Sequence, residues 1–177
     1  MKKKIKPGMR KIKSLLAVIL SFVVWQALRL IYPPMEVHPI FAYIYAIIEM
    51  REDPEKTKKF SLLRIKATVI GLLSGLFFLT VAILLGFSGQ KTYPEILWEF
   101  LLLLASCFVA LTVGDAFRCK NFCGIAAIIA AICVVSIHGT NPYLYALMRT
   151  LQTLIGVGAA TVVNIFIANP LKTKEES

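Results

Sequence analysis

The sequence predicts an all-α membrane protein with six transmembrane helices. Of its 177 residues, 58% are apolar, against roughly 45–50% in a soluble globular domain. Only 17% are charged, and these lie in clusters between long apolar runs. The formal charge of +10 would suggest nucleic acid in a soluble protein. Here Lys and Arg flank apolar segments, where they orient a membrane protein, so the bilayer and not nucleic acid is the expected partner.

Six apolar segments are long enough to span a bilayer, which takes about 20 residues, or fewer for a helix buried among others. In chain order they are Ile12–Leu28, Val37–Ile48, Ala67–Phe87, Phe100–Gly114, Phe122–Ile137 and Thr150–Ala168. The basic start of the chain resembles a secretory signal, but no small-residue cleavage site follows, so the first segment is expected to remain. Tyr32-Pro33-Pro34 is expected to stop the first helix, and Asp53-Pro54 to begin the third.

Val37–Ile48 is the weakest of these segments. It carries His38 and Pro39 and ends at Glu49, so a short, tilted or re-entrant element stays open beside a full span. If it crosses and the N-terminus is inside, 17 of the 20 Lys and Arg residues lie on the inner side. If it does not cross, the basic stretch from Arg51 to Lys66 lies outside, against the positive-inside bias. The charge pattern therefore favours six spans.

The domain organisation follows from these spans. We expect a basic cytoplasmic N-terminus over residues 1–11, one six-helix transmembrane domain over residues 12–168, and a short cytoplasmic tail over residues 169–177. The expected location is the plasma membrane, with several passes and both termini in the cytoplasm.

A short repeat links the third and sixth segments. Arg64–Gly71 and Arg149–Gly156 are identical at four of eight positions, at an offset of 85 residues. If the two segments correspond, the chain consists of two three-helix halves, and the odd number of spans inverts the second half relative to the first. Inverted repeats are typical of transporters.

Each repeat places a cation, a hydroxyl and small residues on one helix face. A fainter version opens the first segment, with Arg10, Ser14, Ala17 and Ser21. Small residues four apart let helices approach closely in lipid. We therefore expect four residues to serve helix packing: Gly71, Gly75, Gly156 and Ala160. The polar residues of the same faces are the candidates for binding an anionic substrate: Arg10, Arg64, Thr68, Arg149, Thr153 and Asn164.

Arg149 is the most informative of these candidates. It lies on the predicted outer side, where the positive-inside bias acts against it, so a specific partner is expected. Two interpretations stay open. The partner is a carboxylate such as Glu36, Glu95 or Glu99, or it is an anionic substrate held by Arg, Thr hydroxyls and helix N-terminal dipoles.

Enzyme chemistry has little support in the sequence. Its two His residues are far apart, no Gly-rich phosphate loop is present, and no cofactor is expected. Cys119 and Cys123 would form a metal site only if other ligands approached, and all four cysteines are expected to be free thiols. Glu49 and Asp115 border the inner ends of two segments, where a solvated boundary charge is favoured over a proton relay.

Several ordered motifs resemble the membrane domain of the aromatic acid exporter and fusaric acid resistance family. They are Gly8–Ser14, Pro39–Ala42, Arg149–Gly156, Val163-Asn164 and Pro170. The resemblance implies six helices in two halves and the export of aromatic or other organic anions. The wider superfamily includes aluminium-activated malate transporters, whose six-helix subunits pair around an anion pathway.

Two departures leave the substrate and the energy coupling open. The chain has Arg51-Glu52-Asp53 where the family often has Gln-Pro-Thr, and a cytoplasmic C-terminal domain is expected to be missing. The matching positions are Arg10, Arg64, Arg149, Gly156 and Asn164.

The sequence thus predicts a membrane exporter or channel for organic anions. The alternative is a non-transporting scaffold or accessory subunit that packs through its small-residue faces. Six short helices make a narrow bundle, so a homodimer is expected. An impermeant maleimide should reach Cys119 and Cys123 only after the membrane is opened.

Overall fold

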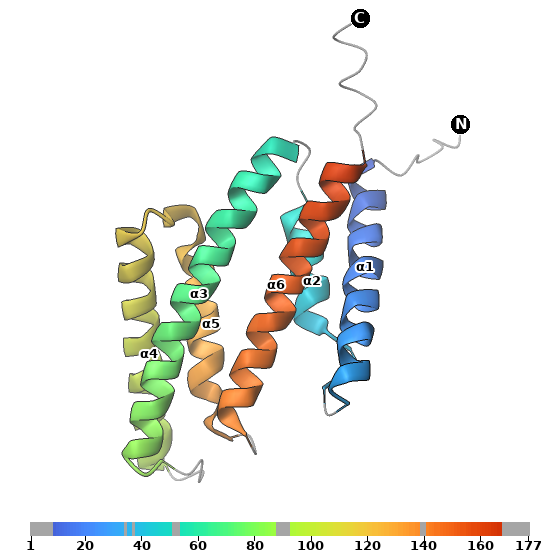
Figure 1. Ribbon diagram of the computed structural model, residues 1–177. Coiled ribbons are helices and arrows are strands. Elements are labelled where there is room, and N and C mark those ends of the chain that lie inside the picture. Colours follow the sequence, from blue (N-terminus) through green and yellow to red (C-terminus); the bar gives the residue numbers. More distant parts are fainter. Residues whose placement is uncertain are drawn as a thin grey trace, which may run out of the picture. The chain divides into compact units, whose positions relative to one another are not determined.

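The computed structural model describes residues 9–33, 35–36, 38–50, 54–87, 93–138 and 141–167. Within them the chain is helical, without strands (Figure 1). The α-helices are α1 (Met9–Ile31), α2 (Ile40–Glu49), α3 (Pro54–Leu84), α4 (Tyr93–Ala116), α5 (Cys123–Val135) and α6 (Pro142–Phe166). Two short 3-10 helices, η1 (Lys120–Phe122) and η2 (Ser136–His138), flank α5.

Each of the six predicted segments overlaps a helix, and Val37 and Ala168 at their ends lie outside the described residues. Helix α1 stops at Ile31, before Tyr32 and the prolines, as predicted. Helix α3 begins at Pro54, where the missing proline N–H costs no hydrogen bond. Helix α6 begins at Pro142, eight residues before the predicted start. The Asn141 Oδ1 atom accepts the Leu144 N–H at 3.2 Å, which caps its first turn.

The helices fall into two length classes. By length and composition, α1, α3, α4 and α6 are long and apolar enough to cross a membrane. Helices α2 and α5 are apolar but have only 10 and 13 residues, or about 15 and 20 Å at 1.5 Å per residue. A hydrocarbon core is about 30 Å thick. Their helical parts alone are therefore too short to span it.

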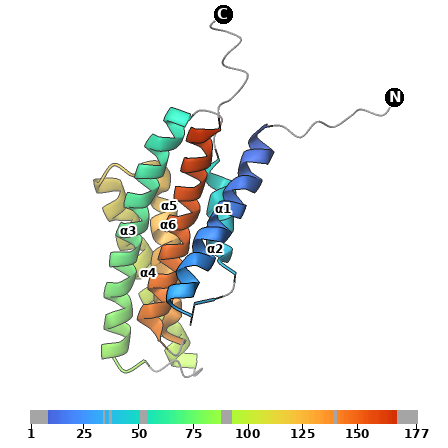
Figure 2. The same cartoon turned by 45° about the vertical axis from the view of Figure 1, so that its right-hand side comes forward.

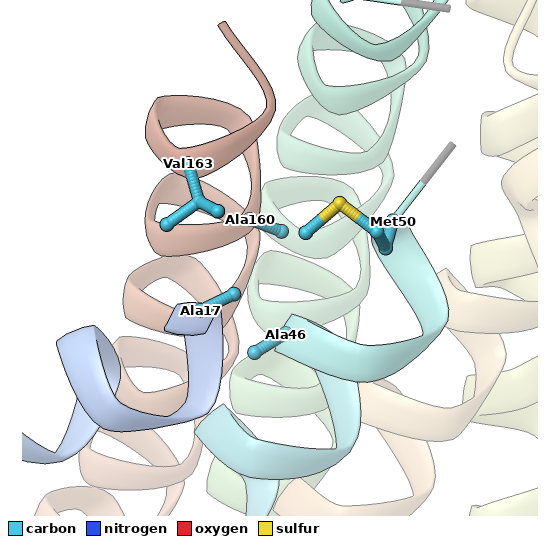
Figure 3. Close-up of a cluster of buried hydrophobic side chains, with 5 residues drawn as sticks. All are labelled: Ala17, Ala46, Met50, Ala160 and Val163. Atoms are coloured by element: carbon cyan, nitrogen blue, oxygen red, sulfur yellow. The ribbon is translucent and has the colours of Figure 1, made fainter. Parts of the chain in front are cut away.

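The chain divides into two compact units. Unit 1 comprises residues 1–61 and 152–177, and unit 2 comprises residues 62–151. In unit 1, α1 packs against α2, and both lie beside the second half of α6 in two views (Figures 1 and 2). Its core joins small side chains and one methionine: Ala17, Ala46, Met50, Ala160 and Val163 (Figure 3).

Unit 2 repeats this arrangement with other helices. Helix α4 packs against α5, and most of α3 belongs to the same unit. One core cluster contains Leu79, Ala82 and Ile137. A second contains Ile129, Cys133 and Ala146. Unit 1 therefore combines α1 and α2 with the second part of α6, and unit 2 combines α4 and α5 with most of α3.

The repeated glycines have equivalent surroundings in the two units. A Cβ atom at Gly156 of α6 would overlap the backbone of Ala42 in α2. A Cβ atom at Gly71 of α3 would overlap the backbone of Ala126 in α5. Gly75, one turn further along α3, has its closest neighbours in Cys133 and Ala130 of α5. Both units therefore bring two helix backbones into contact at a position where only glycine fits.

Candidate functional site

The buried face of α1 carries a cation. Lys13, Ala17, Ser21 and Trp25 are the buried residues of this helix and recur every four positions. Lys13 is only 2% exposed, and its Nζ atom donates to the Oδ1 atom of Asn164 in α6 at 2.9 Å. The sequence pattern had instead placed Arg10 on this face with Ala17 and Ser21.

Small residues position this pair. Ala17 and Ala160 are both fully buried in the same cluster of unit 1. Lys13 precedes Ala17 by one turn, and Asn164 follows Ala160 by one turn. Because small residues let helices approach closely, the ammonium and the amide can meet one turn beyond these alanines.

A second buried polar group joins α2, the start of α3 and α6 within unit 1. Glu49 is fully buried, and the Ser61 hydroxyl donates to its Oε1 atom at 3.0 Å. Ser61 also lies 2.7 Å from the Thr161 hydroxyl, which donates to the Val157 carbonyl at 2.8 Å. The prediction that Glu49 is a solvated boundary charge is therefore wrong, because α2 ends inside unit 1, where the Ser61 hydroxyl takes the place of water at Oε1. Asp115 is exposed, as that prediction required.

Further along α6, Gln152 and Thr153 are fully buried. The Gln152 Nε2 atom donates to the Oε2 atom of Glu36 at 3.3 Å. The backbone carbonyl of Glu36 accepts the indole N–H of Trp25 at 2.8 Å. Glu36, one of the carboxylates considered for Arg149, thus contacts α6 through Gln152 and ties the segment after α1 to unit 1.

Unit 2 holds two of the predicted candidates on α3. Arg64 is 4% exposed, and its guanidinium carbon lies 5.2 Å from the centroid of the Phe122 ring, within the range of a cation–π interaction. Thr68, one turn later, is fully buried, and its hydroxyl has no hydrogen-bond partner among the residues described. The hydroxyl of Ser106 in α4 is buried in the same way.

Arg149 is half-buried in α6, two turns after the helix begins. Its guanidinium carbon lies 4.6 Å from the centroid of the Tyr145 ring, one turn earlier on the same helix. This contact orients the side chain back along α6 toward Pro142, as helical side-chain geometry favours.

Arg10 lies in a different setting from Asn164. It is exposed and lines an open groove of about 520 Å³. The groove is formed by α1 and α2 of unit 1, and its lining residues are Arg10, Lys11, Ser14, Leu15 and Ile47.

The described residues thus connect only some of the predicted candidates. Asn164 contacts a buried cation, and Arg64 and Thr68 share one face of α3, but Arg10 faces outward. Sequence reasoning missed Lys13, which was counted only as an orienting charge. Its spacing of four from Ala17 and eight from Ser21 was the available signal.

The cysteines offer no metal site in the part of the chain that the structure describes. All four are free, as expected. Cys119 and Cys123 are buried, and the Cys123 thiol donates to the Oδ1 atom of Asp115 at 3.2 Å. No group of three His, Cys, Asp or Glu side chains suited to a metal ion occurs among the described residues.

Of the comparisons with known proteins, the one with protein families gives a match. No curated protein and no solved structure shows a significant match to the chain. The model of the family described as aromatic acid exporter family member 1 matches residues 5–167. That range includes every helix that the structure describes and all the candidate residues above, and the chain therefore belongs to the aromatic acid exporter family.

Proposed function

We propose that the chain is a multi-pass membrane transporter or channel that exports aromatic or other organic anions. The observation that carries this proposal is the buried Lys13–Asn164 pair, a cation 2% exposed whose hydrogen-bond partner among the described residues is a neutral amide. Membership of an exporter family supports the same function.

The energetics of burial explain why this pair points to an anion. An ionised ammonium withdrawn from water costs several kcal/mol unless other groups compensate. An amide oxygen supplies one hydrogen bond but no opposite charge, whereas an ammonium has three N–H donors. A carboxylate substrate would supply the charge and accept a further hydrogen bond of about 1.5–3 kcal/mol.

The packing weighs against a scaffold. A scaffold would need its small-residue faces free to receive a partner helix. Gly156 already contacts the backbone of Ala42 within unit 1, and Gly71 that of Ala126 within unit 2. These two glycines are used inside the chain itself, which favours transport.

We also propose six crossings with both ends in the cytoplasm and two inverted halves. The equivalent contacts of Gly71 and Gly156 support the inverted repeat. Helices α2 and α5 would cross with the help of flanking residues outside the α-helices, such as those of η1 and η2 beside α5, which membrane proteins tolerate where backbone groups are buried in protein.

Cysteine labelling tests the topology. Cys119 and Cys123 are 1% and 6% exposed, so their thiols would react slowly from either side and are poor reporters. Asn121 is exposed in the same segment. Asn121→Cys in a chain without other cysteines should react with an impermeant maleimide only after the membrane is opened. Rapid labelling in intact cells would exclude the proposed orientation.

A homodimer remains the proposed assembly. The mass of the protein in lipid nanodiscs measures it. A monomer with full activity would refute the dimer without affecting the proposed substrate class.

Transport in proteoliposomes tests the function. Wild-type protein should move a labelled aromatic acid faster than empty vesicles do. Lys13→Gln, which removes the buried charge, should weaken substrate binding about 10- to 150-fold, the value of one charge-assisted hydrogen bond. Lys59→Gln is the control, because Lys59 is exposed on α3. Flux equal to that of empty vesicles across a panel of organic anions would refute the proposal.

A further inference from the structure

The groove between α1 and α2 has a chemistry that the proposed transport does not use. Arg10 and Lys11, in the first turn of α1, are exposed and lie at this groove. Leu15 and Ile47 also line it and are 66% and 52% exposed. Ser14 adds a hydroxyl. Cationic groups, a hydroxyl and apolar side chains thus line one concave surface.

This combination matches an amphiphile with a negative head. Two adjacent cations attract a phosphate group, and a guanidinium can bind it with two parallel hydrogen bonds. Leu15, one turn along α1 from Lys11, and Ile47 of α2 offer an apolar surface for an acyl chain. Basic pockets between transmembrane helices bind lipid head groups in this way.

The charge of the sequence that forms the α1 side of the groove also favours an anion. No Asp or Glu occurs before Glu36, whereas seven Lys or Arg residues occur up to Lys13. A negatively charged head group therefore meets no acidic side chain from this part of the sequence. A zwitterionic head group carries a positive charge that the same cations repel, so it would bind less tightly.

We propose that an anionic phospholipid binds in this groove, with its phosphate at Arg10 and Lys11 and an acyl chain along Leu15 and Ile47. The site rests on the membrane placement of α1 in the proposed function but not on transport. Arg10 then serves lipid binding, whereas the buried face of the same helix carries Lys13.

Native mass spectrometry of the detergent-purified full chain tests the proposal. With equal amounts of phosphatidylglycerol and phosphatidylcholine, the protein should retain phosphatidylglycerol preferentially. Arg10→Gln and Lys11→Gln should each weaken that binding about fivefold, as expected for one cation at a lipid surface. Ile47→Trp, which fills the groove and keeps both cations, should also weaken it.

Arg29→Gln is the matched control. Arg29 lies in the last turn of the same helix and lines a smaller groove of about 220 Å³ with Gln26, Leu30 and Pro33. This change should leave phosphatidylglycerol binding at the Met9 end unchanged. A thermal-shift titration of the wild type with inorganic phosphate should give less stabilisation than phosphatidylglycerol.

Three results would overturn the lipid site. They are equal retention of the two lipids, wild-type phosphatidylglycerol binding by a chain with both Arg10→Gln and Lys11→Gln, and equal stabilisation by inorganic phosphate, which would indicate a free-anion site. No transport substrate is needed in this assay, so a chain that fails to export can still bind the lipid.

Discussion

The two compact units share a close glycine contact between helices but differ at two buried hydroxyls, those of Thr68 and Ser106 in unit 2. In each, a glycine of the repeated octapeptide lies against the backbone of a short helix: Gly156 on Ala42 in unit 1, and Gly71 on Ala126 in unit 2. In unit 1 the buried Lys13 and Ser61 are hydrogen-bonded to Asn164 and Glu49.

In unit 2 the buried hydroxyls of Thr68 and Ser106 have no partner among the described residues. The repeated glycines therefore give the same helix packing in both units, while the hydrogen bonding of the buried polar residues differs between them. Buried polar groups are almost always hydrogen-bonded in native proteins, so an exception on a predicted site face is worth testing. The hydrogen-bonded hydroxyls of Ser61 and Thr161 in unit 1 should contribute to stability, whereas those of Thr68 and Ser106 in unit 2 should reduce it.

The largest expected effect on stability comes from changing the two glycines that contact a facing helix. Gly71→Ala and Gly156→Ala each place a Cβ atom into a facing backbone, which cannot move as a flexible side chain can. Each change should lower the free energy of unfolding by about 3 kcal/mol, the upper part of the usual range for overpacking. Thermal unfolding of the purified variants in detergent measures this loss.

Each unit offers its own control. A Cβ atom at Gly158 in α6 or at Gly124 in α5 would meet no atom within 4 Å. Gly158→Ala and Gly124→Ala should therefore be neutral or stabilising by up to about 1 kcal/mol through helix propensity. If Gly71→Ala lowered the free energy of unfolding and Gly156→Ala did not, the two units would not share this glycine contact.

The next largest effect concerns Arg149, which opens the repeat in α6 and belongs to unit 2. If its guanidinium binds substrate, Arg149→Gln should weaken anion binding about 10- to 150-fold with insertion and folding intact. Transport and melting temperature should be measured on the same purified variant, with Arg118→Gln as the control because Arg118 is exposed.

The competing role for Arg149 is neutralisation of a carboxylate. Removing the cation would then strand that carboxylate, and the melting temperature would fall. Recovery of the melting temperature by a second change, Glu99→Gln or Glu95→Gln, would assign Arg149 to structure. Wild-type flux together with wild-type stability would eliminate both roles.

The helices and their packing positions were readable from the sequence for a physical reason. Apolar runs and prolines act locally, so the end of α1 before Tyr32 and the start of α3 at Pro54 follow from neighbouring residues. The repeated glycines were also visible, because small residues recur at helical spacing. Family membership was recognisable from ordered motifs, and the match over residues 5–167 confirms it.

The buried polar groups were not readable in the same way. Lys13 looked like one more orienting cation because its neighbours in sequence are basic. Its spacing from Ala17 was visible, but its hydrogen-bond partner Asn164 lies 151 positions away. Glu49 looked solvated because it ends an apolar run, and only Ser61 from the next helix shows that it is buried. Both depend on contacts between helices, which periodicity along one helix does not contain.

The smallest expected changes in stability come from removing single hydroxyl groups, and they should have opposite signs in the two units. Thr161→Val removes a hydroxyl bonded to Ser61 and Val157 in unit 1, so the free energy of unfolding should fall by about 1 kcal/mol, the net value of a typical hydrogen bond. Thr68→Val in unit 2 removes a buried hydroxyl without a described partner and keeps the shape of the side chain. It should raise the free energy of unfolding by about 1 kcal/mol.

Flux distinguishes a substrate role for Thr68 from a purely structural one. Its hydroxyl follows the buried Arg64 by one turn, and if substrate binds there, Thr68→Val should become more stable and yet transport less. This is the trade expected where a binding site keeps a polar group at the expense of stability. Ser106→Ala is the matched control: its hydroxyl is equally buried and without a described partner, but it lies on α4, outside the predicted site. That variant should gain stability with unchanged flux. A loss of stability in Thr68→Val would mean that this hydroxyl makes a stabilising hydrogen bond. The proposed difference between the hydroxyls of the two units would then be wrong for Thr68.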